Sequence, residues 1–163
     1  MRALALALLL TSCKLDLDSS SAPMQAKCAV NTVSPLCVNA ANASDFTFIK
    51  ASIFDANCFG SACHEMAGTA KLHFSKDVPQ ATAYANLMGY TSTVDPKYQV
   101  IVPGDPAASY MELMIQKIPP AKMSPPASAP PSNIGYMPQA SMILCCQKLD
   151  AIDRWIAAGA MND

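Results

Sequence analysis

Apolar side chains recur at helical spacing beyond the N-terminal region of the chain. Phe46, Ile49 and Ile53 stand at positions i, i+3 and i+7, which places them on one face of a helix. Ser44 or Asp45 precedes this stripe, and both are residue types that cap helix N-termini. We therefore expect a helix that begins there and leads directly into the cysteine motif described below.

The same reasoning predicts three more helices, over residues 79–88, 107–118 and 145–158. The apolar stripe of the last helix consists of Leu149, Ile152, Trp155 and Ile156. No segment alternates convincingly between apolar and polar residues, and 98–102 is the best short candidate for a strand. Residues 119–138 hold seven of the thirteen prolines, a density that neither a helix nor a central strand tolerates. The pattern predicts a small all-α protein with long loops.

The N-terminal residues have the pattern of an export signal. Arg2 is followed by eight apolar residues, 3–10, a run too short to span a bilayer but typical of a secretory signal. The run ends in Leu10-Thr11-Ser12-Cys13, which resembles a bacterial lipobox. The resemblance implies a lipoprotein signal peptide over 1–12 and a lipid on Cys13. We expect a protein anchored outside the cytoplasm to a bacterial membrane, in the periplasm or at the outer membrane. An ordinary signal cleaved nearby is the alternative.

Composition divides the rest of the chain in two. Residues 13–43 are polar and rich in Ser, Ala and Asn, which predicts a tether, and the folded domain is expected over 44–163. The 11 Lys and Arg residues nearly balance the 12 Asp and Glu residues, and no basic block occurs, so nucleic acid is not expected as a partner. We find no paired carboxylates, phosphate loop, zinc cluster or catalytic triad in the sequence, and therefore do not expect an enzyme.

The candidate chemistry lies in Cys58-Phe59-Gly60-Ser61-Ala62-Cys63-His64. Two thiols followed by a histidine are what covalent haem attachment needs, because each thiol can add to one vinyl group while the imidazole ligates the iron. The spacing is C-x4-C-H rather than the usual C-x-x-C-H, so two extra residues must loop out between the cysteines. The alternative is a Cys58–Cys63 disulfide beside an ordinary surface histidine. The motif favours haem held by Cys58 and Cys63, with His64 as the proximal ligand.

The other cysteines predict disulfides. With Cys13 assigned to lipid and the motif cysteines to haem, four of the seven remain, and an even number outside the cytoplasm indicates two bridges. Cys28 and Cys37 could close a small loop, which would leave Cys145 and Cys146 as a strained vicinal pair. The alternative is that each of the adjacent cysteines pairs with one of the N-terminal two. Normal disulfide geometry slightly favours this cross-pairing.

The sixth position of the iron has several candidate ligands. Met137, followed by a proline, is the first choice, because a thioether favours Fe(II) and a proline-stiffened loop presents it with little loss of entropy. Met123 lies in the same proline-rich loop and Met142 just beyond it. His73 is the only other histidine. Because the chain has ten methionines, and methionine often fills cores, spacing alone does not decide between them.

An ordered set of short motifs resembles small, lipid-anchored bacterial cytochrome c-like proteins. The set covers residues 46–160: the entry helix and C-x4-C-H, then 83–87 (Ala-Tyr-Ala-Asn-Leu), 102–110 with its Pro-Gly-Asp-Pro step, Tyr136-Met137-Pro138 and 152–160. The resemblance implies a cytochrome c-like helical domain around one covalent haem c, with His64 as the proximal ligand and Met137 as the distal ligand.

This resemblance implies a function. We expect an extracytoplasmic monohaem cytochrome that carries single electrons between redox protein partners, with the haem pocket walled by Phe54, Phe59, Leu87 and Trp155. The alternative is a haem-free lipoprotein, a binding or structural module stabilised by its disulfides.

Overall fold

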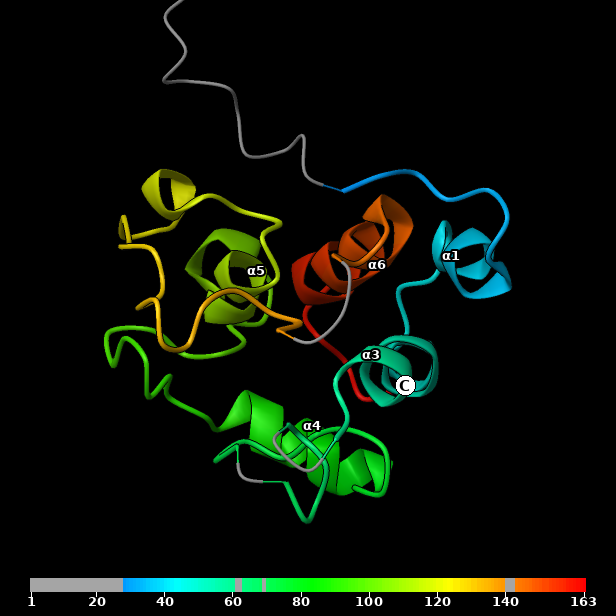
Figure 1. Ribbon diagram of the computed structural model, residues 1–163, viewed down its shortest axis with the longest axis horizontal. Coiled ribbons are helices and arrows are strands. Elements are labelled where there is room, and N and C mark those ends of the chain that lie inside the picture. Colours follow the sequence, from blue (N-terminus) through cyan, green and yellow to red (C-terminus); the bar gives the residue numbers. More distant parts are fainter. Residues whose placement is uncertain (1–27, 61–62, 69, 140–142) are drawn as a thin grey trace, which may run out of the picture.

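The computed structural model describes residues 28–60, 63–68, 70–139 and 143–163. Its helices are α1 (Pro35–Ala40), α2 (Phe46–Ile49), α3 (Asp55–Asn57), α4 (Gln80–Met88), α5 (Tyr110–Met114) and α6 (Cys146–Ala157), with a π-helical turn η2 (Lys50–Phe54) and two 3₁₀ turns, η3 (Pro106–Ala108) and η4 (Pro120–Lys122) (Figure 1). Over these residues, β structure is limited to one antiparallel bridge, between Thr91 and Gln99. The expected all-α class is confirmed, and residues 98–102 form no strand.

The predicted first helix is continuous from α2 through η2 to α3. Asp45 caps it: its carboxylate accepts a hydrogen bond from the backbone N–H of Phe48 at 2.6 Å. The sequence did not indicate the wider π turn, in which the N–H of Asp55 donates to the carbonyl of Lys50. This spacing also brings the Lys50 ammonium within 2.5 Å of the Asp55 carboxylate. The helix ends next to Cys58, as the sequence predicted.

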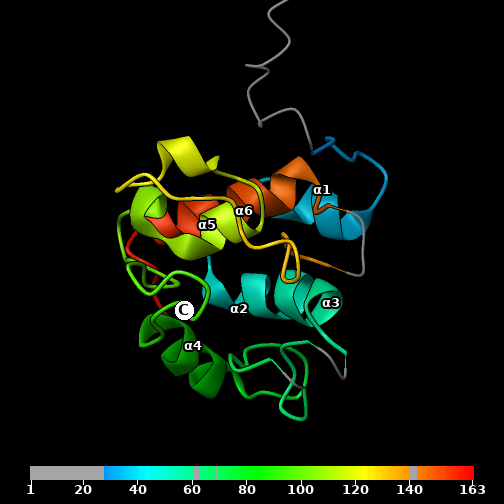
Figure 2. The ribbon, with the colours of Figure 1, turned by 60° about the vertical axis from the view of Figure 1, so that its left-hand side comes forward.

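The last predicted helix, α6, packs its apolar face into the middle of the molecule. Its stripe of Leu149, Ile152, Trp155 and Ile156 is buried, as expected. The Trp155 ring stacks on Phe46 of α2, with centroids 5.1 Å apart, and its indole N–H donates to the Met161 carbonyl at 2.8 Å. In Figure 2, α5, α6 and α1 form an upper row, α2 and α3 lie beneath it, and α4 lies at the bottom.

Residues 28–43, where the sequence predicted a tether, pack against the last helix. Disulfides join Cys28 to Cys146 and Cys37 to Cys145, which is the cross-paired alternative. Helix α1 packs on α6, and Cys37 and Ala40 are buried. The polar composition concealed this contact because it uses small side chains and disulfides in place of large apolar residues. Only residues 13–27 of the expected tether remain, and they lie outside the described part.

The helix expected over 107–118 is divided and shorter. Ser109 has an extended backbone between η3 and α5, and its hydroxyl accepts from the Val102 N–H at 2.8 Å and donates to the Asp105 carbonyl at 2.9 Å. Such local side-chain bonds compete with the helical ladder. The chain leaves the helix after Met114, and Gln116 has a left-handed backbone with φ of 64°.

The remaining predictions of local structure hold. The helix expected over 79–88 is α4, preceded by Pro79 and followed by Gly89. The proline-rich stretch 119–138 is loop apart from the short turn η4. None of the helices in the described residues has the length and apolar character of a membrane span.

Candidate functional site

The structure contains a cavity of about 620 Å³ that is lined by the residues predicted from the sequence to bind haem. Cys58, Cys63, His64 and Met137 all line it. Its walls are mainly apolar, and its size lies in the range of roughly 300–1,000 Å³ that is usual for small-molecule and cofactor sites. The four predicted site residues therefore share one space. The residues of the cavity from the C-x4-C-H segment and the stretch after it (Cys58, Phe59, Cys63, His64, Leu72 and Phe74) are called here the motif wall.

A compact turn brings the two cysteines of the motif wall together. The Cys63 N–H donates to the Gly60 carbonyl at 2.8 Å, and the His64 N–H donates to the Cys58 carbonyl at 3.2 Å. Gly60 has φ of 124°, a conformation that side-chain-bearing residues rarely adopt. The two extra residues of the motif, 61 and 62, lie outside the described part. Both thiols line the same cavity.

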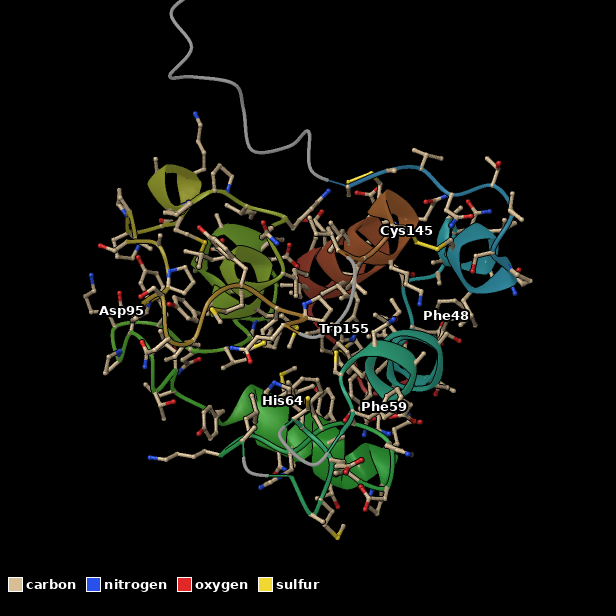
Figure 3. All side chains as sticks on the ribbon, viewed as in Figure 1. Phe48, Phe59, His64, Asp95, Cys145 and Trp155 are labelled. Carbon is tan, nitrogen blue, oxygen red and sulfur yellow. A yellow bond between two sulfur atoms is a disulfide. The ribbon has the colours of Figure 1, made fainter. Side chains whose placement is uncertain are left out.

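The imidazole of His64 is held in one orientation. Its Nδ1 lies 2.7 Å from the Leu72 carbonyl oxygen, so Nδ1 carries the proton and donates. The ring stacks on Phe74 at a centroid distance of 4.5 Å. This leaves Nε2 as the nitrogen available to a metal, in the arrangement that fixes histidine ligands. In Figure 3, His64 lies above α4, toward the middle of the view.

Burial keeps this imidazole neutral. Desolvation lowers the pKa of His64 below 6.5, and the charge of His73 adds to the effect, while the hydrogen bond to Leu72 opposes it. A histidine must be neutral to bind a metal. His64 is therefore in the ligating form at neutral pH.

Backbone hydrogen bonds brace the motif from behind. The His64 carbonyl accepts from the N–H groups of Phe74 and Ser75, at 2.9 and 3.0 Å. The buried Ser75 hydroxyl donates to the Cys58 carbonyl at 2.7 Å. The first cysteine and the histidine are thus tied to one segment, and their relative position is fixed by bonds that need no cofactor.

The two motif cysteines are the free thiols among the described residues, since the other four described cysteines form disulfides. Burial, together with the smaller effects of Cys63 and Asp55, raises the pKa of Cys58 to about 12, and the charge of Lys148 opposes the shift. The buried Lys148 ammonium donates to the Asn57 side chain at 2.6 Å, beside this thiol. No sequence pattern pointed to Lys148, because it lies 90 positions from Cys58 and becomes its neighbour only through folding.

A second part of the cavity lining is rich in thioethers and is called here the methionine wall. It comes from α5 and the end of the proline-rich loop, and consists of Met111, Met114, Ile115, Ile134, Met137 and Pro138. The Met137 N–H donates to the Met114 carbonyl at 2.8 Å, which joins the loop to the end of α5. Sequence reasoning missed Met111 and Met114 as lining residues.

The other distal candidates have different surroundings. Met123 is buried in a separate cluster with Tyr98, Tyr110 and Leu113 and does not line the cavity. His73 does not line it either, and its Nδ1 bonds to the Glu65 carbonyl at 2.6 Å. Met142 lies outside the described residues.

Two of the four residues that were expected to wall the haem pocket line the cavity. Phe54 and Phe59 line the cavity, whereas Leu87 and Trp155 are buried in the main core away from it. Residues 1–12 and the expected lipid site Cys13 lie outside the described part of the chain.

The side chains at the cavity that commonly ligate haem iron or bind haem covalently are the oriented imidazole of His64, two thiols and several thioethers. In the described residues, no three His, Cys, Asp or Glu side chains gather in a way that could hold a metal ion by themselves. Comparison of the chain with protein-family models, with curated proteins and with solved structures found no match. The chemistry of the cavity therefore has to be inferred from its own residues.

Proposed function

We propose that this protein is an extracytoplasmic monohaem c-type cytochrome, cytochrome c-like in fold, that carries single electrons between redox protein partners. One observation carries the proposal: two free thiols and an imidazole with an available Nε2 line one apolar cavity that thioethers also line. The three residues of the sequence motif, Cys58, Cys63 and His64, all line this cavity.

The donor set fits haem c. Each thiol adds its sulfur and its hydrogen across one vinyl C=C bond, which gives two thioethers without an oxidant or reductant. The Nε2 of His64 is the proposed proximal ligand, and Met137 is the proposed sixth ligand. When bound, the haem supplies reversible one-electron chemistry at its iron.

The chain contributes orientation and polarity. The Leu72 carbonyl holds the His64 ring and its tautomer, and the Ser75 and Phe74 contacts hold the backbone of the motif. A thioether ligand and an apolar cavity both favour the reduced, less charged iron, so we expect a potential higher than that of a bis-histidine site. The two disulfides hold the fold in an oxidising compartment.

Covalent attachment is the decisive test. The full chain is produced in a host that assembles c-type cytochromes, beside a Cys58→Ser, Cys63→Ser variant. After extraction with acidified acetone, the wild type should keep its haem absorbance and carry the mass of one haem, while the double variant should lose both.

A wild-type chain that contains a Cys58–Cys63 disulfide and no haem mass would overturn the proposal. That result would favour the alternative, a haem-free lipoprotein that serves as a binding or structural module.

The location forms part of the same proposal. We propose that the lipobox-like residues 10–13 direct acylation of Cys13 and that the acyl chains anchor the protein to a bacterial membrane. The mass of the N-terminal peptide tests this directly, since it should begin at Cys13 and include the lipid. An unmodified N-terminus elsewhere would contradict the anchor and leave the haem proposal standing.

A further inference from the structure

Four aliphatic side chains near the N-terminal end of the described chain face solvent. Val30, Val33, Leu36 and Val38 are 69%, 87%, 40% and 46% exposed. Val30, Val33 and Leu36 are called here the α1 patch; Val38 lies two positions after Leu36 and therefore on another side of α1. No Asp, Glu, Lys, Arg or His occurs from residue 28 to residue 44. An exposed aliphatic group within an uncharged stretch is typical of a surface that is covered in use.

The α1 patch is held rigidly on the fold. The disulfides of Cys28 and Cys37 attach both ends of the segment to α6, as Figure 3 shows at Cys145. Between them, the Asn31 backbone exchanges two hydrogen bonds with the Gln147 side chain, at 3.1 and 2.8 Å. A segment with so few buried large side chains would not keep one conformation without these links. The structure therefore fixes an apolar surface that its own core does not use.

One charged side chain of α6, that of Arg154, reaches the end of this segment. The Arg154 guanidinium donates to the Ala40 and Ala43 carbonyls, both at 2.8 Å, just beyond the end of α1. Cations at this position satisfy the free carbonyls of a helix C-terminus. These bonds hold the guanidinium at the carbonyls of Ala40 and Ala43.

The place of the patch in the chain indicates what covers it. Cys28 follows the proposed lipid site, Cys13, by 15 residues. Even a fully extended chain of that length reaches only about 50 Å, at roughly 3.3–3.6 Å per residue. A surface tethered this closely meets the bilayer at an effective concentration on the order of millimolar.

We propose that the α1 patch docks on the lipid bilayer and fixes the orientation of the domain on its membrane. The proposal rests on the lipid anchor of the proposed function and does not depend on haem. Aliphatic residues without charge insert at the acyl boundary, whereas surfaces for proteins are enriched in aromatic residues and Arg, which the patch lacks. Because no cation takes part, docking should not require anionic lipid.

The test uses the full lipidated chain in vesicles of neutral phosphatidylcholine that contain a diazirine-bearing phosphatidylcholine. After irradiation, reduction and trypsin, lipid adducts are compared between peptide 28–50, which holds the patch, and peptide 77–97, which holds α4 and has similar length. We expect at least fivefold more adduct on 28–50. The double variant Val30→Asp, Val33→Asp should lower that labelling at least threefold. Met66→Asp, at a 56% exposed methionine outside the segment, should leave it unchanged.

The experiment distinguishes failure of the docking proposal from failure of the lipid anchor or of the cytochrome function. Flotation with the vesicles reports the anchor, and the haem band reports the cytochrome. Chains that float but label both peptides equally overturn the docking proposal alone, whereas chains that do not float overturn the anchor and docking together. Irradiation in native membranes that links peptide 28–50 mainly to a protein would also overturn it and identify a protein partner instead.

Discussion

The two parts of the cavity lining are built in different ways. The motif wall is assembled from a short stretch of sequence, and its key residues are tied by hydrogen bonds to the segment 72–75. The methionine wall joins α5 to a loop more than twenty residues away, and the hydrogen bond from the Met137 N–H to the Met114 carbonyl links the two.

This contrast indicates that the two walls have different roles in binding a cofactor. A wall fixed by its own hydrogen bonds can present two thiols and an imidazole before any cofactor arrives, which lowers the entropy lost on binding. A wall of flexible thioethers can adapt its shape to the group that fills the cavity. We therefore expect changes in the motif wall to decide whether haem is held, and changes in the methionine wall to decide how it behaves.

The largest effect should follow from His64→Ala. Removing the proposed proximal ligand should reduce the covalent haem content at least tenfold and leave a poorly folded chain, because the haem would form part of the core. Haem absorbance per mole of protein after acidified acetone measures it.

His73→Ala is the matched control for this change. Its imidazole does not line the cavity, so the haem content should remain near that of the wild type. Equal losses in the two variants would show that His64 has no special role.

Met137→Ala should keep the haem and change its properties. Loss of the proposed thioether ligand should lower the midpoint potential by on the order of 0.1 V, since axial ligands tune haem over about 0.8 V. The reduced iron should then bind carbon monoxide. Redox titration and the carbon monoxide difference spectrum measure both effects.

Met114→Ala separates ligation from packing. Met114 lines the same cavity, but its link to Met137 is through the backbone, which the substitution keeps. This variant should retain a low-spin spectrum. A low-spin spectrum in Met137→Ala would show that another group ligates the iron, with Met111 and Met114 the candidates placed at the cavity.

The sequence predicted most of what depends on neighbouring residues. The helices of 46–57 and 145–158, the proximity of Cys58 to His64 and the loop character of 119–138 all follow from local spacing. The division at Ser109 was missed because a serine hydroxyl can bond to the backbone or point to solvent, and spacing does not tell which.

Contacts between distant residues were much harder to predict. Ten methionines gave no means of singling out those at the cavity, and Lys148 comes beside Cys58 only through folding. The packing of α1 was missed because it depends on Ala40 and on cysteines, which carry no amphipathic pattern. Only the count of four remaining cysteines, with the geometry that favours cross-pairing, indicated that the segment is joined to the last helix.

A buried carboxyl group next to the methionine wall should make stability depend on pH. Glu112 of α5 is fully buried, and neither of its carboxylate oxygens has a hydrogen-bond partner among the described residues. Burial raises its pKa well above 4.5; Asp153 and Asp150 add to this, and Lys117 opposes it. The folded state therefore holds this proton more tightly than the unfolded state, and stability should fall as the pH rises from 4.5 through the raised pKa.

Glu112→Gln should remove this dependence. The variant stays neutral, so at pH 8 it should be more stable than the wild type, by an amount that grows with pH as Glu112 ionises. The difference should shrink as the pH approaches 4.5. Urea unfolding at several pH values measures it, and parallel pH profiles for the two proteins would contradict the assignment.

The smallest expected effect tests how firmly the motif wall is braced. Ser75→Ala removes the hydroxyl that donates to the Cys58 carbonyl, but that carbonyl also accepts from the His64 N–H at 3.2 Å and is not left unpaired. We therefore expect a loss of only about 1 kcal/mol in the free energy of unfolding, with the haem content unchanged. Urea unfolding measures the loss, and Ser128→Ala, at an exposed serine, should show none. A loss of haem in Ser75→Ala would mean that this single bond holds the first thiol in place and that the motif wall is less redundant than its hydrogen bonds indicate.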